Sequence, residues 1–278
     1  MSDAKPERFE IEEFSYYWTV DAEQFKAKIE NVETIMIVGF PPMGNVIPYQ
    51  LKELLSDADE IGSIYSYNFP PMVEARDDEF EIPHDELWYS AEKRLFCYVG
   101  KYPETEYIPK SAYKQVEGVA QLARELNVKE LYTVGVILPQ QEPFKKQGGE
   151  ITAFIGCFEG SKKKIPKNMR KMTRRNIGRY TIIRKTGLLP GFAAMLGIES
   201  YAILGAGTYP EDLRACARAL RAFKQLSGLV IEETAEIESM FERSAEAVEA
   251  RMREQREKAK AAYRGEGLGA EPNEYMYG

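Results

Sequence analysis

The sequence predicts an α/β fold, in which a layered, mostly parallel sheet is flanked by helices and followed by a long C-terminal helix. Apolar runs of strand length, rich in Val, Ile, Tyr and Phe, recur between residues 34 and 230. Segments with helical spacing of apolar residues lie between these runs. Strands that alternate with helices are typical of parallel sheets with covered faces, and 278 residues suffice for one sizeable core with an appendage.

The first half of the core is predicted from clear local signals. The run TIMIVGF at 34–40 ends in Gly and predicts a strand buried on both faces. Asn45 is placed to cap the following helix, whose apolar residues form one stripe. Further strands are predicted at 61–67 and 94–100, with a hairpin in EFEIPHDELWYS, 79–90, between them.

The second half continues the alternation and ends at Gly228, a typical helix stop. In chain order, the prediction is a helix at 111–126, strands at 131–137, 151–158 and 180–185, a short helix at 189–196, a strand at 200–206 and a helix at 210–228.

A long charged helix is predicted from 231 to 264. Its acidic residues gather at the start and its basic residues at the end, which suits the helix dipole. Glu249 with Arg253, and Glu254 with Lys258, have the spacing of stabilising pairs. A narrow apolar seam for the body or another helix is formed by Ile237, Phe241, Val248, Met252 and Ala259.

The glycine-bearing segment after this helix predicts a flexible tail. The chain therefore divides into an acidic N-terminal arm at 1–30, an α/β core at 31–230, the helix at 231–264 and the tail at 265–278.

Charge is distributed unevenly. The net charge is −7, yet no Asp or Glu occurs from Gly160 to Ile198. Within this basic stretch a helix is predicted from Pro166 to Gly178. The stretch is interpreted as a solvated face, as a contact with the acidic arm of another copy, or as a patch for an acidic partner. The patch comprises Lys167, Arg170, Lys171, Arg174 and Arg175. Nucleic acid and anionic membrane are disfavoured, because few aromatic residues accompany these bases.

The residue inventory leaves little room for catalysis or metal binding. His84 is the single histidine, which rules out a two-histidine metal site. A polar loop position is favoured for it over a base oriented by Asp85. Three cysteines, far apart, suit reduced thiols in the cytoplasm. The acidic N-terminus lacks an apolar signal core, and no run approaches the roughly 20 apolar residues of a membrane span. No cofactor or metal is predicted.

The loop after the first core strand, GFPPMGN at 39–45, has the glycine spacing of a phosphate-binding loop. Such a loop needs Lys and then Ser or Thr after its second glycine, but Asn45 and Val46 follow Gly44 here. Pro41 and Pro42 also remove two backbone donors. A rigid strand-to-helix turn is the favoured interpretation.

Several segments in order resemble the archaeal proteasome assembly chaperone family. They are IVGFPPMGNVIPYQL, IGSIYSYNFPPMV, ELYTVGV and TGLLPGFAAMLGIESYAILGAG, and the likeness covers roughly 30–230. Its loop pattern is matched by Gly39, Pro41, Gly44 and Asn45, whereas Pro42 and Ile47 stand where the family more often has Gly. The resemblance implies a phosphorylase/hydrolase-like α/β body without established catalysis, assembled as homo-oligomers. Some members of the family act on the proteasome core particle.

The chain ends in Met276-Tyr277-Gly278, which fits the hydrophobic-Tyr-any ending by which proteasome activators and assembly factors dock between α-subunits. A terminal carboxylate offers a charge to a basic pocket, Tyr277 a flat face with a polar tip, and Met276 a flexible apolar filler. The predicted function is a non-enzymatic, homo-oligomeric assembly chaperone or activator-like factor on the 20S α-ring. The alternative is a small-ligand-binding or hydrolase-like enzyme that uses loop 39–45.

Overall fold

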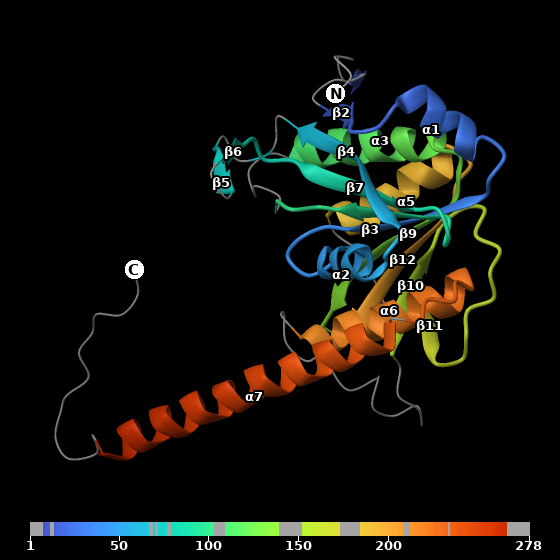
Figure 1. Ribbon diagram of the computed structural model, residues 1–278. Coiled ribbons are helices and arrows are strands. Elements are labelled where there is room, and N and C mark those ends of the chain that lie inside the picture. Colours follow the sequence, from blue (N-terminus) through green and yellow to red (C-terminus); the bar gives the residue numbers. More distant parts are fainter. Residues whose placement is uncertain are drawn as a thin grey trace.

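The computed structural model (Figure 1) describes residues 8–11, 14–66, 69, 72–76, 79–102, 109–138, 152–172, 184–207, 212–232 and 234–265. Its centre is a ten-stranded sheet. In spatial order the strands are β1 (Arg8–Ile11), β2 (Phe14–Trp18), β4 (Ala58–Ser66), β7 (Asp85–Ser90), β8 (Leu95–Val99), β3 (Thr34–Gly39), β9 (Val128–Ile137), β12 (Glu199–Ala206), β10 (Ala153–Cys157) and β11 (Met169–Lys171).

The sheet is mixed, and its parallel pairing is concentrated at the centre. β8, β3, β9 and β12 run parallel to one another. On the other side of β8, neighbouring strands pair antiparallel, in the order β1, β2, β4, β7 and β8. β10 is antiparallel to β12, and the edge strand β11 is parallel to β10. The predicted α/β fold with flanking helices is confirmed, but the sheet is mixed and not mostly parallel. Its parallel part is the segment in which crossover helices connect the strands.

Helices cover both faces of this sheet, as Figure 1 shows. One face carries α1 (Ala22–Ile29), α3 (Pro109–Glu125) and α5 (Lys185–Met195), and the other carries α2 (Val46–Leu54), α6 (Leu213–Ser227) and α7 (Thr234–Gly265). Along β3, Met36 and Val38 enter the first apolar cluster and Ile37 enters the second. This alternation explains why an unbroken apolar run was needed there.

The ends of α6 are set by local signals, of which the predicted stop at Gly228 is confirmed. Asp212 caps α6 by accepting a hydrogen bond from the backbone N–H of Arg214 at 3.1 Å. Gly228 ends the same helix in the left-handed region, with φ of 75°. Asn45 stands at the N-cap of α2, although its side chain makes no capping hydrogen bond. No helix among the described residues is both long and apolar enough to cross a membrane.

The predicted hairpin at 79–90 is wrong. Its first part, β6 (Glu79–Glu81), pairs with β5 (Glu74–Arg76) in a separate two-stranded sheet. Its second part, β7, pairs with β4 on one side and β8 on the other. Both edges of β7 are therefore occupied, and no edge is left for β6. The predicted strand at 180–185 lies mostly outside the described residues, and Lys185 begins α5 instead.

Candidate functional site

The three tail residues, Met276, Tyr277 and Gly278, lie outside the described residues. The structure does describe α7, the helix that precedes them. The first turns of α7 lie on α6, where Ile237, Phe241 and Ala245 are buried. These residues repeat at every fourth position, so they form one apolar stripe along the helix. The first half of the predicted seam therefore packs on the body.

Ion pairs border this stripe. Arg221 of α6 binds Glu238 and also Glu242, the latter with 2.6 Å between Nη2 and Oε1. Arg214 binds Glu249, two turns further along α7. Partial burial acts to lower the pKa of Arg221, but the two carboxylates outweigh it and raise that pKa above its ordinary value. Three carboxylates on one face thus hold α7 at a fixed angle to α6.

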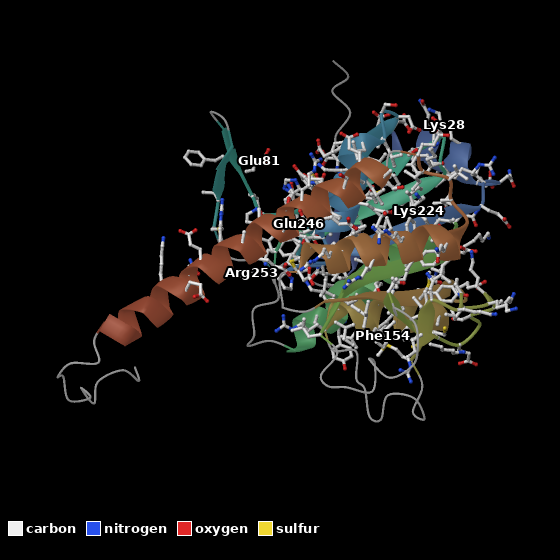
Figure 2. All side chains as sticks on the ribbon, turned by 90° about the horizontal axis from the view of Figure 1, so that it is seen from below. Lys28, Glu81, Phe154, Lys224, Glu246 and Arg253 are labelled. Atoms are coloured by element: carbon white, nitrogen blue, oxygen red, sulfur yellow. The ribbon has the colours of Figure 1, made fainter. Side chains whose placement is uncertain are left out.

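The C-terminal part of α7 leaves the body, as Figure 1 shows, and Arg253 lies on this projecting part in Figure 2. Side chains at 253–255 and 257–258 are exposed. The predicted pairs are present, with 3.9 Å between Arg253 and Glu249 and 2.7 Å between Lys258 and Glu254. Residues 250–265 add about 24 Å of helix at 1.5 Å per residue. Anything that follows Gly265 therefore starts well away from the sheet.

Loop 39–45 is a tight turn between β3 and α2. A Cβ added to Gly39 would overlap the carbonyl oxygen of Gly44, and one added to Gly44 would overlap the carbonyl oxygen of Val134. Phe40 and Met43 are buried, and the peptide bond from Pro41 to the next proline is cis. The backbone of this loop fills its own interior, so only glycine fits at its two ends.

A buried polar network lies beside this loop, and we define it as Asp85, Tyr98, Gln115 and Lys185. The Tyr98 hydroxyl donates to Oδ2 of Asp85 at 2.6 Å, and Nε2 of Gln115 donates to the same oxygen at 2.8 Å. Nζ of Lys185 donates to Oε1 of Gln115 at 2.9 Å and lies 4.9 Å from the ring centre of Phe40. The network therefore connects β7, β8, α3 and α5 to the loop.

Burial dominates the proton equilibria of this network. It raises the pKa of Asp85, although Lys185 and the hydrogen bond from Tyr98 oppose the rise. Burial, together with the Asp85 carboxylate, raises the pKa of Tyr98 well above its ordinary value. Asp85 also accepts a hydrogen bond from the backbone N–H of Lys101 at 2.8 Å. A carboxyl group and a lysine are thus held by protein donors and acceptors within the core.

A second polar cluster lies on the opposite face of β7. Oε2 of Glu86 accepts hydrogen bonds from Nζ of Lys52 and Nε1 of Trp88, both at 2.9 Å. Its Oε1 lies 2.6 Å from Nζ of Lys101. Burial acts to raise the pKa of Glu86, but hydrogen bonds from Lys101 and Lys52 outweigh it and lower the pKa to about 2. Lys52 also lies 4.1 Å from the Trp88 ring centre.

The structure does not bring the basic residues to loop 39–45. Lys167 and Lys171 are exposed and Arg170 is half-buried at the β11 edge of the sheet, while Arg174 and Arg175 lie outside the described residues. The predicted helix at 166–178 is wrong at 169–171, which form β11. β10 offers an open strand edge there, and Met169 is buried by pairing with it.

The remaining candidates occupy structural positions. His84 lies in the turn before β7, with Nδ1 2.9 Å from the carbonyl oxygen of Ile82, and Asp85 points into the buried polar network instead. Cys97 and Cys216 are buried and Cys157 is half-buried, all as free thiols. Burial raises the pKa of Cys216 to about 12. Over the described part of the chain, no group of three His, Cys, Asp or Glu residues is arranged to hold a metal.

The sequence interpretation missed Gln115 and Lys185. Gln115 precedes Val119 by four residues and so stands on the inward stripe of α3, a signal that marks a polar residue for burial. No comparable pattern marks Lys185.

Solved structures share this fold over most of their length. The archaeal proteasome activator PbaB of Pyrococcus furiosus aligns with a TM-score of 0.66 and 20% identity over 88% of this chain and 100% of PbaB. PbaA of the same organism, an archaeal homolog of proteasome-assembly chaperone, gives 0.55 and 17% over 83% of this chain and 95% of PbaA. A protein of unknown function from Thermoplasma acidophilum gives 0.59 and 13% over 87% and 98%.

No curated protein matches the chain significantly. A family match, however, is direct. The sequence profile of the PAC2 family matches residues 36–256, far more than half of the sequence, and the chain therefore belongs to the PAC2 family.

Proposed function

We propose that this protein is a non-enzymatic, homo-oligomeric proteasome factor, an assembly chaperone or an activator. It docks Met276-Tyr277-Gly278 on the α-ring of the 20S proteasome. Two structures with the same fold are an archaeal proteasome activator and a homolog of a proteasome-assembly chaperone. The proposal takes Gly278 to carry a free carboxylate.

The course of α7 is the observation that carries the proposal. Its first half is anchored to α6 by Ile237 and Phe241 and by the ion pairs of Arg221. Its second half leaves the body with exposed side chains. From Gly265 to Gly278 an extended chain reaches up to roughly 45 Å. A tripeptide carried in this way can enter a pocket on a neighbouring protein without a clash from the α/β core.

A single tripeptide binds weakly, so homo-oligomerisation is part of the mechanism. Several tails on one assembly bind at a high effective concentration, in the mM range for short flexible linkers. The α/β core then gathers the copies, and the tails make the contact with the α-ring.

The packing of loop 39–45 argues against the alternative, a ligand-binding or hydrolase-like site. The loop packs tightly at both of its glycines, and Pro41 and Pro42 lack the backbone N–H donors that would hold an anion. The polar groups beside it, Asp85, Gln115 and Lys185, bind one another inside the core. Their arrangement therefore suits a structural role better than a catalytic one.

The test is capture of purified 20S α-rings by the full chain. Tyr277→Ala, and one Ala appended after Gly278, should each reduce capture at least about tenfold, because each removes one part of the tripeptide recognition. Tyr275→Ala is the matched control, since it removes a tyrosine from the same tail but leaves the tripeptide intact. Equal capture by wild type, Tyr277→Ala and the extended chain would refute tail docking.

A further inference from the structure

The hairpin β5–β6 is amphipathic, and it stands away from the main sheet (Figures 1 and 2). Ala75 is paired directly with Phe80, and Glu74 with Glu81. Directly opposed residues share a face, and positions two apart along a strand share it too. Val73, Phe80 and Ile82 therefore lie on one apolar face, and Glu81 lies on the other.

This apolar face is uncovered. Phe80 is 78% exposed, Ile82 65% and Val73 59%. Within the described part of the chain, β5 packs appreciably against β6 alone. A lone two-stranded hairpin is marginally stable in water, and it needs a surface to bury its apolar face. The hairpin thus has the composition of a docking arm without its receptor.

Charge indicates which surface receives it. The sequence EARDDEFE at 74–81 contains five acidic residues and one arginine. The segment at 160–171, which we call the basic segment, contains six Lys and Arg residues and no acidic one. Lys162, Lys164 and Lys167 are exposed there. Opposite charges of this density favour association of the two surfaces.

The receiving surface also carries apolar side chains. The basic segment lies along the end of α6, because Nζ of Lys163 donates to the carbonyl oxygen of Leu226 at 2.8 Å. Nδ2 of Asn168 donates to Oε1 of Gln225 at 3.3 Å in the same region. Val230, just beyond this helix end, is 71% exposed, and Ile165 is half-buried. Exposed Val230 beside a segment rich in Lys and Arg is complementary to exposed Phe80 and Ile82 in a segment rich in Asp and Glu.

We propose that the β5–β6 hairpin of one copy docks on the surface formed by Val230, Ile165 and the basic segment of a second copy. The two surfaces lie at opposite ends of the molecule, the hairpin on the left of Figure 1 and β11 on the lower right. One copy therefore does not satisfy its own hairpin. A head-to-tail contact of this kind repeats from copy to copy, and it closes into a ring where the rotation permits. Hairpin-to-hairpin pairing is disfavoured, because it brings two acidic segments together.

The experiment measures the mass of the full-length protein by sedimentation velocity and native mass spectrometry. The hairpin variant is Phe80→Ser/Ile82→Ser, and the receiving variant is Lys164→Glu/Val230→Glu. Each should weaken self-association about 100-fold or more, since each removes apolar burial and the second also reverses charge. Met195→Ser, 81% exposed on α5, is the control and should assemble like wild type. Circular dichroism checks that every variant is folded.

Mixing the two variants separates this contact from a symmetric one. Each variant alone lacks one half of the interface, but the mixture contains one intact hairpin and one intact receiving surface. Equimolar mixing should therefore restore one-to-one pairs. The proposal is overturned if wild type does not self-associate at micromolar concentration, if either variant assembles like wild type, or if the mixture does not pair.

This inference relies on the proposed function only for homo-oligomerisation, and the two fail in different measurements. Failure of tail docking appears as unchanged α-ring capture by Tyr277→Ala. Failure of the hairpin contact appears as unchanged mass of the hairpin variant, whatever the α-rings do.

Discussion

The polar groups beside loop 39–45 and those on the projecting part of α7 are of similar residue types, but the first are buried and the second are exposed. Asp85, Gln115 and Lys185 lie inside the core, where they are hydrogen-bonded to one another or to neighbouring groups. On the last turns of α7 charged side chains are exposed, and on the β5–β6 hairpin Phe80 is exposed. The residues that look catalytic by type are thus inside, and the residues suited to contacts with other proteins are outside.

The difference assigns separate tasks to the two regions. A buried charge is tolerated only where partners replace water, so the buried polar network holds β7, β8, α3 and α5 in one arrangement. Exposed apolar residues on a thin projection are unfavourably hydrated, and contact with a partner lowers the free energy. We therefore expect substitutions in the network to change stability, and substitutions on the projections to change association.

Lys185→Met is expected to have the largest effect, and it tests most directly whether the buried polar network stabilises the fold. The variant leaves the Asp85 carboxyl and Gln115 without their buried cation, and the free energy of unfolding should fall by about 3 kcal/mol or more. Urea unfolding at pH 7 measures it. Arg184→Met is the matched control, because it alters the exposed neighbouring residue and should cost less than about 0.5 kcal/mol.

A loss below about 1 kcal/mol for Lys185→Met would show that the network is not a structural brace. The ligand-binding interpretation of loop 39–45 would then regain weight, because a buried lysine with no structural purpose is the kind of group that binds an anion.

Glu86 should make the stability of the core pH-dependent, with the next largest effect. Its folded-state pKa is about 2, below the ordinary value of 4.5. A depressed carboxyl pKa stabilises the folded state above the unfolded pKa, and this stabilisation disappears as pH falls from about 4.5 towards 2. Glu86→Gln removes the effect. The difference in unfolding free energy between wild type and variant should therefore shrink by about 2 kcal/mol between pH 7 and pH 2.

Urea titrations of both proteins across this pH range give the difference directly, and acids common to both cancel. A difference that stays constant with pH would mean that Lys52 and Lys101 do not stabilise the Glu86 carboxylate.

Local sequence patterns predicted the elements whose cause is local. The run at 34–40 became β3, Gly228 ended α6, and the pairs at Glu249 and Glu254 formed on α7. Each depends on residues within a few positions, through alternation, left-handed backbone or side-chain spacing. The layered α/β architecture follows from the order of such elements.

The errors came from partners that are distant in sequence. Whether β6 pairs with β7 or with β5 depends on β4 and β8, which already occupy both edges of β7. The residues at 169–171 became a strand because β10 had a free edge. Likewise, Lys185 and Asp85 meet through Gln115 although the two lie 100 positions apart, and no local pattern contains that contact. The exposed apolar face of the β5–β6 hairpin could not be predicted either, because it too depends on which strands pair with each other.

Arg221→Met gives the smallest expected effect and sharpens the comparison at the point where body and projection meet. Arg221 is 40% exposed, so its pairs with Glu238 and Glu242 should contribute about 1 kcal/mol or less to global stability. Local opening is a more sensitive measure. Hydrogen exchange over residues 237–249 should become faster in the variant, while exchange in β3 and β9 should stay unchanged. Lys258→Met is the control, since its pair with Glu254 lies beyond the body. If exchange at 237–249 is the same in all three proteins, and Arg214→Met leaves it unchanged too, Ile237 and Phe241 hold the helix by burial alone. The direction of α7 would then depend on apolar packing, which salt does not screen, and tail presentation should be independent of ionic strength.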